Sequence, residues 1–218
     1  MKKENKPIFG LGAGLLAAFG LWTLAVCLID VQPIGPDGSA VGFAALNGFL
    51  HRLTGVHWWL YALTDWLGLI PLAVAALFGL LGLCQLIRRK SLWKVDGSIL
   101  VLGGFYAAVI AVFLLFEKCV VNYRPVLIEG VLEASYPSST TLLTMCVMST
   151  AALQLRSRIQ NPGLRTALIA AIWLFTVLMV LGRLISGVHW FSDIVGGALL
   201  SAGLVMLYHA VCQQFDLL

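Results

Sequence analysis

The feature that most limits the fold of this chain is a series of six apolar segments, each long enough to cross a bilayer. They cover residues 8–29, 66–87, 99–116, 138–155, 166–181 and 194–211. A spanning helix needs about 20 apolar residues, and 138–155 alone covers roughly 27 Å. Only 11% of the sequence is charged, against about 25% in soluble domains. The sequence therefore predicts an all-α, polytopic membrane protein, with residues 1–218 forming a single bundle of six transmembrane helices.

Basic residues predict which side of the membrane each connection faces, because Lys and Arg are retained in cytoplasmic loops. With the N-terminus inside, the inner side would hold Lys2, Lys3, Lys6, Arg88, Arg89, Lys90, Lys94, Arg156, Arg158 and Arg165. The outer side would hold only Arg52, Lys118, Arg124 and Arg183. We therefore expect a multi-pass protein of the plasma membrane with both termini in the cytoplasm.

The connection between the first two segments, residues 30–65, has the composition of a helix that lies on the outer membrane surface. A turn-rich stretch is followed by a mildly amphipathic one, and then by Trp58, Trp59 and Tyr61. Aromatic side chains of this type sit at the depth of the lipid head groups. We expect an outer interfacial helix here, which could admit a lipid laterally, and a simple connector is the alternative.

Phosphate chemistry is indicated where the fifth segment ends and the sixth begins. Arg183 offers a planar fork of donors that fits phosphate oxygens. Neutral imidazole attacks phosphorus without first losing a proton, and His189 stands six residues later. Asp193 follows at helical spacing and can orient the ring. Such a pair also arises by chance, so the triplet gains weight from other motifs on the same predicted side.

Two further motifs fall on that side. The Pro after Arg124 keeps Arg124 out of a helix, so that its side chain can leave the helix axis. Without other evidence, Lys118 and Arg124 would be read as anchors for lipid head groups. Pro137 followed by Ser138 and Ser139 is typical of a helix start, where free backbone N–H groups bind anions.

Together these three motifs resemble the type 2 phosphatidic acid phosphatase superfamily of integral membrane lipid phosphatases. The family pattern is Lys, six residues, Arg-Pro; then Pro-Ser-Gly-His; then Ser-Arg, five residues, His, three residues, Asp. This chain matches it, in order, at Arg124-Pro125, Pro137-Ser138, Arg183, His189 and Asp193. The six-helix topology with outward sites is similar too.

The resemblance implies a phosphatase or diphosphatase that needs no metal or cofactor and forms a phosphohistidine intermediate. His189 would attack phosphorus, and Asp193 would orient it. The phosphate ligands implied are Arg124, Arg183, Lys118, Ser138 and Ser139. The implied partners are the lipid phosphate or diphosphate and the bilayer, with no nucleic acid.

Three positions depart from the family pattern. Lys118 precedes Arg124 by one residue fewer than the pattern requires, and Gly182 replaces a Ser. Thr140 replaces the His that protonates the leaving group in the family. A hydroxyl is too weak an acid for that role, and general acid help is worth about 10²–10⁴ in rate. We therefore expect a lipid diphosphate, such as a polyprenyl diphosphate, to be favoured, because its leaving phosphate is stable without a proton.

Other readings stay open. His57 or Glu133 could supply the missing proton from elsewhere on the outer side. A catalytically weak lipid-phosphate binder would explain the departures, although the intact set of Arg183, His189 and Asp193 argues against it. A transporter would need charges near the middle of the membrane, and the six segments have none there.

Overall fold

The computed structural model describes residues 5–218 and is all-α, with no β-strand in that part of the chain. Lys2 and Lys3, which enter the orientation argument, lie outside the described residues. The helices are α1 (Lys6–Leu28), α2 (Ala44–Thr54), α3 (Trp58–Leu67), α4 (Leu69–Arg89), α5 (Gly97–Lys118), α6 (Ser139–Arg158), α7 (Pro162–Ile185) and α8 (Phe191–Gln214). Two short 3-10 turns, η2 (Pro36–Gly38) and η3 (Leu92–Lys94), lie in the connections.

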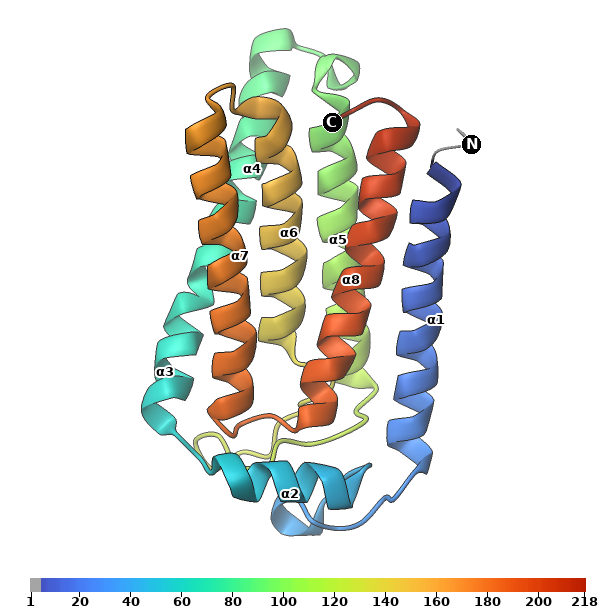
Figure 1. The fold of residues 1–218 in the computed structure, drawn as a ribbon, viewed down its shortest axis with the longest axis vertical. Coiled ribbons are helices and arrows are strands. Elements are labelled where there is room, and N and C mark those ends of the chain that lie inside the picture. The colour runs from blue at the N-terminus through green and yellow to red at the C-terminus, as the bar shows by residue number, and fades with distance from the viewer. Residues whose placement is uncertain (1–4) are drawn as a thin grey trace.

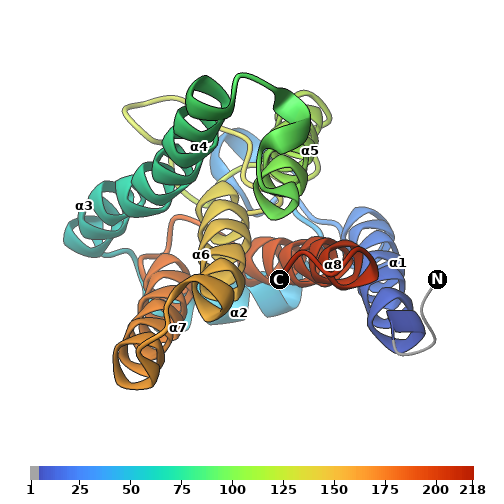
Figure 2. The same cartoon turned by 90° about the horizontal axis from the view of Figure 1, so that it is seen from above.

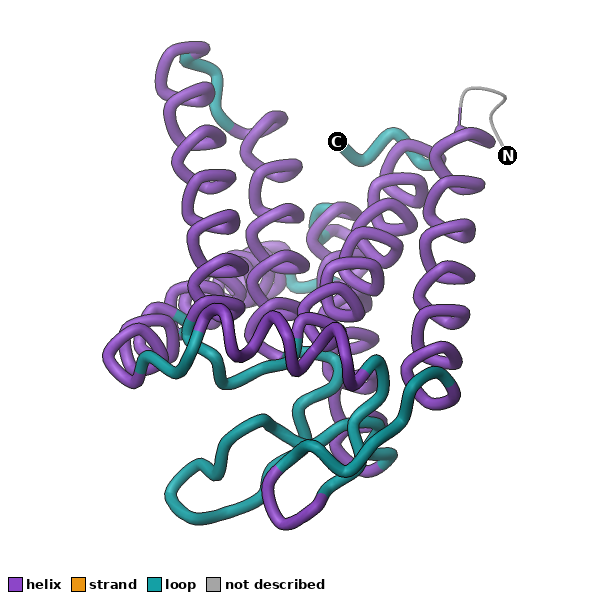
Figure 3. Tube along the Cα trace, turned by 60° about the horizontal axis from the view of Figure 1, so that its bottom comes forward, coloured by secondary structure: helices purple, strands orange, loops and turns teal. Residues whose placement is uncertain are grey.

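The long helices form a bundle with α6 at its centre (Figures 1 and 2). α6 packs against α4, α5, α7 and α8, while α1 packs along the outer side of α8. Both ends of the chain lie at one end of the bundle, and α2 lies across the opposite end (Figure 1). Figure 3 brings the α2 end forward and shows that the long loops gather there. We call this the loop end, and the other the terminal end.

Within residues 5–218, five helical stretches are long and apolar enough to cross a membrane, and one of them, Trp58–Arg89, joins α3 to α4 across Gly68. In four of the five most side chains face outward, as in α4, where Pro71 is the single buried residue, whereas 44% of the apolar stretch of α8 is buried. α6 differs, because more than half of its residues are buried and many of these are Thr or Ser. The prediction of an all-α polytopic membrane protein is confirmed, and α6 is the predicted segment that does not meet the criterion of length and composition.

The connection between α1 and α4 forms two helices where the sequence predicts one. α2 covers residues of the amphipathic stretch, and α3 begins at Trp58. Trp58 and Trp59 are exposed, as expected of anchoring residues. Tyr61 is not: its ring faces the Arg183 guanidinium, whose central carbon lies 5.1 Å from the ring centroid. α3 therefore belongs to the surroundings of Arg183.

A cluster of paired polar groups ties the helices together at the terminal end. Arg89 and Arg158 both pair with Asp96, at 3.0 Å and 3.3 Å. Arg158 also donates to Gln154 at 2.9 Å, and Gln154 donates to the Tyr208 hydroxyl at 2.6 Å. We call these residues the Asp96 cluster. It links α4, α6, α8 and the start of α5 through two ion pairs to one carboxylate and through hydrogen bonds.

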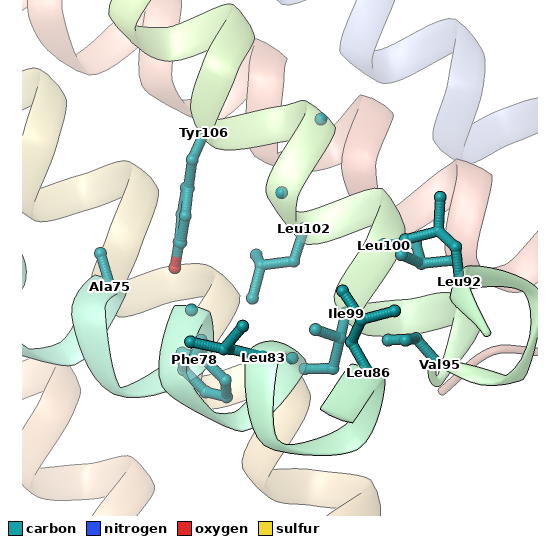
Figure 4. Close-up of a pocket in the computed structure, with 14 residues that line it drawn as sticks. Ala75, Phe78, Leu83, Leu86, Leu92, Val95, Ile99, Leu100, Leu102 and Tyr106 are labelled. Atoms are coloured by element: carbon teal, nitrogen blue, oxygen red, sulfur yellow. The ribbon is translucent and has the colours of Figure 1, made fainter. Parts of the chain in front are cut away.

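A cavity of about 420 Å³ opens between α4 and α5 (Figure 4). Its lining is apolar, and Tyr106 is the single ionisable side chain among the lining residues. The cavity holds none of the residues that the motifs single out, so it offers no chemistry for the predicted reaction.

Candidate active site

The loop end brings together three residues from separate parts of the sequence. Arg183 is in the last turn of α7, His189 is in the connection from α7 to α8, and Arg124 is in the loop from α5 to α6. Nη1 of Arg124 lies 3.2 Å from Nε2 of His189, and Nη2 of Arg183 lies 3.5 Å from the same nitrogen. Two guanidinium groups thus converge on one ring nitrogen.

All three side chains are removed from solvent. Arg183 is 1% exposed, His189 3% and Arg124 9%. Burial, and after it the positive charges of Arg124 and Arg183, lower the pKa of His189 well below its usual range. The ring is therefore neutral near pH 7 and can present a lone pair at Nε2, which is the state that a nucleophile requires.

The site contains buried polar atoms without partners. Among the described residues, Arg183 Nε and His189 Nδ1 make no hydrogen bond. Buried donors of this kind are rare in folded proteins, because an unpaired buried polar group costs about 1–3 kcal/mol. Two arginines with spare donors around one neutral ring form a site that is suited to an anion with several oxygens.

Asp193 lies next to His189 as the spacing predicts. Its Oδ2 is 3.7 Å from Nδ1 of His189, which is too long for a hydrogen bond but close enough to orient a protonated ring. The carboxylate is fully buried and is held by the backbone N–H of Trp190 at 2.9 Å and by the Asn122 amide at 3.1 Å. Nothing in the motifs pointed to Asn122, whose one sequence signal is its place two residues before Arg124.

The backbone that carries His189 is held by α2 and by the start of α3. Gly187 has φ +72°, a conformation that favours glycine. Its carbonyl is contacted by Nε2 of His51 at 3.1 Å, and the carbonyl of Ser186 accepts from the backbone N–H of His57 at 3.0 Å. The His57 ring lies against the Thr54 carbonyl at 2.8 Å. Both histidines thus contact the loop that carries His189 or its flanking turn, and the His57 ring is recorded against the Thr54 carbonyl.

The two predicted phosphate ligands at the start of α6, Ser138 and Ser139, differ in their exposure to solvent. Ser138 is fully buried, accepts a hydrogen bond from the Thr141 N–H as the helix cap, and donates its own N–H to the Asp193 carbonyl. The cap uses an acceptor lone pair of Oγ and leaves the hydroxyl proton for another partner. Ser139 and Thr140 are partly exposed and line a groove of about 410 Å³ between α4, α5 and α6.

Two further charged residues that the sequence analysis singled out, Lys118 and Glu133, differ in their contacts with the site arginines. Lys118 is exposed at the end of α5, and its side chain makes no hydrogen bond or ion pair with any described residue. Its role as a phosphate ligand stays a prediction. Glu133 pairs with Nε of Arg124 at 2.9 Å, so it holds that side chain from the loop.

α3 supplies contacts that sequence reasoning missed. Arg183 donates to the Thr64 hydroxyl at 3.4 Å and lies 3.8 Å from a carboxylate oxygen of Asp65. This approach depends on Gly182, because a Cβ at that position would lie 2.7 Å from the Thr64 methyl group. Thr64 therefore occupies the space, and supplies a hydroxyl, near the position where the family pattern has a Ser.

Comparison with known proteins gives one family match and one similar solved structure. The family model described as the PAP2 superfamily matches residues 72–216. A solved structure, titled as the first transmembrane PAP2 type phosphatidylglycerolphosphate phosphatase from Bacillus subtilis, has the same fold, with a TM-score of 0.64 and 16% sequence identity. The alignment covers 94% of this chain and 95% of that one. No curated protein matches.

Proposed function

This chain belongs to the PAP2 superfamily, and we propose that it is a membrane lipid phosphatase that hydrolyses a lipid phosphate or diphosphate through a phosphohistidine intermediate. One observation carries the proposal: two buried arginines converge on Nε2 of a buried, neutral histidine. A phosphate placed there would face the lone pair of His189 and accept hydrogen bonds from Arg124 and Arg183. The same groups would stabilise the negative charge that develops on the transferred phosphoryl group.

The reaction would proceed in two steps. In the first, Nε2 of His189 forms a bond to phosphorus while the bond to the leaving oxygen breaks, and that oxygen keeps the electron pair. The ring becomes cationic, and the buried carboxylate of Asp193, next to Nδ1, stabilises it. In the second step, water attacks phosphorus, the P–N bond breaks, and the electron pair returns to His189. Inorganic phosphate leaves and the neutral ring is restored.

The leaving group decides which lipid is favoured. Thr140 lines the groove next to the site and cannot protonate an alkoxide. A diphosphate releases a lipid monophosphate, which is stable without a proton, so we propose a polyprenyl diphosphate in preference to phosphatidate. The apolar residues of the same groove are suited to the lipid chain.

The proposed reaction needs no metal ion, and the proposed topology has six transmembrane helices. Beside the nucleophile His189 the reacting set has two arginines, whose guanidinium groups donate to an anion and do not ligate a cation. We propose that α6, 20 residues long and enclosed by the other helices, is the sixth transmembrane helix. Basic residues predominate at the terminal end, so the termini would be cytoplasmic and the site extracytoplasmic, in a plasma membrane.

The test is phosphate release from a polyprenyl diphosphate and from phosphatidate, with chelator present. We expect His189→Ala to lower the rate by roughly 10³-fold or more, because it removes the nucleophile. His209→Ala is the matched control, since His209 contacts Gln213 on α8 and none of the site residues. Release of phosphate by His189→Ala at the native rate would refute the mechanism. Binding of both lipids with no release by the native chain would instead support a lipid-phosphate binder.

A further inference from the structure

One carboxylate beside the site has no role in the reaction described above. Asp65 lies in α3, within the apolar stretch Trp58–Arg89, and its side chain is 63% exposed. Ionisable residues within apolar membrane segments are costly and generally functional. The partner of Asp65 is Arg183, whose nitrogen lies 3.8 Å from the carboxylate oxygen, a distance too long for a hydrogen bond. A purely stabilising role therefore does not explain why a carboxylate stands here.

The position of Asp65 relative to Thr140 gives it a chemical role. Both residues line the groove of about 410 Å³ whose remaining walls are mostly apolar side chains of α4, α5 and α6. Thr140 stands where a proton-transferring side chain is missing. A single guanidinium, that of Arg183, separates the Asp65 carboxylate from Nε2 of His189. Asp65 thus lines the groove and, through its contact with Arg183, also borders the site of His189.

Glu133, the carboxylate that pairs with Arg124, allows a comparison with the position of Asp65. It is the other carboxylate paired with a site arginine, and it holds Nε of Arg124 at 2.9 Å. It lines a different cavity, on the α5–α6 loop, whose lining does not include Thr140 or Asp65. Each arginine therefore has its own carboxylate, and of the two only Asp65 lines the groove that also holds Thr140.

We propose that Asp65 is the general base for hydrolysis of the phosphohistidine, and so replaces the proton-transferring side chain that Thr140 cannot provide. The inference rests on the proposed function. As the water oxygen bonds to phosphorus, its proton passes to the Asp65 carboxylate, the P–N bond breaks, and the electron pair returns to Nε2 of His189. Asp65 then releases the proton to solvent through its exposed side. The first step needs no proton when the leaving group is a lipid monophosphate.

The experiment is a rapid-quench measurement with a polyprenyl diphosphate that carries ³²P in its terminal phosphate. Phosphohistidine survives alkali and is hydrolysed by acid, so labelled enzyme can be counted after an alkaline quench. For Asp65→Asn we expect a burst of lipid monophosphate close to one equivalent per enzyme. Turnover should then fall about 10²-fold, and labelled protein should accumulate, because only the second step has lost its base.

Glu133→Gln is the matched control, because it removes the carboxylate from the other arginine. We expect slower turnover without accumulation of label, since this change disturbs Arg124 and leaves the general base in place. If Asp65→Asn slows turnover with no burst and no label, then Asp65 only positions Arg183, and the proposal is overturned. Turnover of Asp65→Asn at the native rate would overturn it as well.

A second variant keeps the test valid if Asp65→Asn folds poorly. Asp65→Ala leaves space beside an exposed groove, so added formate should enter and restore part of the turnover while the label disappears. Lack of rescue in a folded Asp65→Ala variant would count against the proposal. Failure of the proposed function is distinguished by His189→Ala: if that variant retains activity, no phosphohistidine forms, whereas the result for Asp65 alone leaves the role of His189 unchanged.

Discussion

Two groups of arginines at opposite ends of the bundle are organised in opposite ways. In the Asp96 cluster, Arg89 and Arg158 converge on a carboxylate. At the loop end, Arg124 and Arg183 converge on a neutral imidazole. No polar atom of the Asp96 cluster is both buried and unpartnered in the described chain, whereas Arg183 Nε and His189 Nδ1 are.

The contrast shows how paired charges that hold a structure differ from charges that await a ligand. Convergence of two cations without an anion between them costs free energy, and folded proteins retain such arrangements mainly at functional sites. Two carboxylates pair with these arginines, Glu133 with Arg124 and Asp65 with Arg183, and neither is recorded in contact with Nε2 of His189. That nitrogen is thus left to the substrate.

The largest effect that would test this contrast is on catalysis. Arg183→Ala should lower kcat/KM for the lipid diphosphate by about 10³-fold, because it removes charge stabilisation from a water-excluded site. Thermal unfolding in detergent should show no comparable loss of stability, since the substitution also relieves repulsion with Arg124. A variant that lost stability and activity together would place Arg183 among the structural arginines.

Arg158→Ala should show the reverse pattern. The change removes bonds to Asp96, Gln154 and the Ser98 hydroxyl, so we expect a loss of about 1–2 kcal/mol in unfolding free energy. Phosphate release by the folded fraction should stay within about threefold of the native rate. Denaturant titration followed by tryptophan fluorescence measures the first quantity. A large fall in kcat with unchanged stability would contradict the distinction between the two ends.

The smallest effect concerns pH. The pKa of His189 is depressed in the folded chain, so below about pH 6.5 the unfolded chain binds a proton that the folded chain does not. Stability from this residue is therefore present above pH 6.5 and is lost as pH falls, by about 0.7 kcal/mol between pH 7 and pH 6. His189→Gln should lack this part of the slope when unfolding is compared at both pH values. Identical slopes would mean that the folded ring protonates normally.

The sequence predicted the general architecture and the centre of the site for physical reasons that can be named. Apolar segments report on the bilayer whatever their packing, and the order and sidedness of the motifs carrying Arg124, Arg183 and His189 imply that they meet. The resemblance drawn from those motifs is confirmed by the family match over residues 72–216. The roles assigned to the individual residues stay predictions.

The rest depended on contacts between helices, which local patterns do not encode. Thr64 and Asp65 stand at the border of an apolar run, and nothing in that run shows that α3 lies beside α7. Ser138 fits an anion-binding helix start, and the structure adds that its Oγ caps α6. Lys118 matches a motif by type, and the structure adds that it is exposed at the end of α5.

The close approach of Thr64 to Gly182 has a consequence for how this site can change over generations. A Ser at position 182, as in the family pattern, would collide with the Thr64 methyl group, which lies 2.7 Å from where its Cβ would stand. A lineage could therefore acquire that Ser without damage only after Thr64 had become smaller. The two positions are 118 residues apart in the sequence. A single van der Waals contact couples them, so substitutions at the two positions are expected to occur in a fixed order.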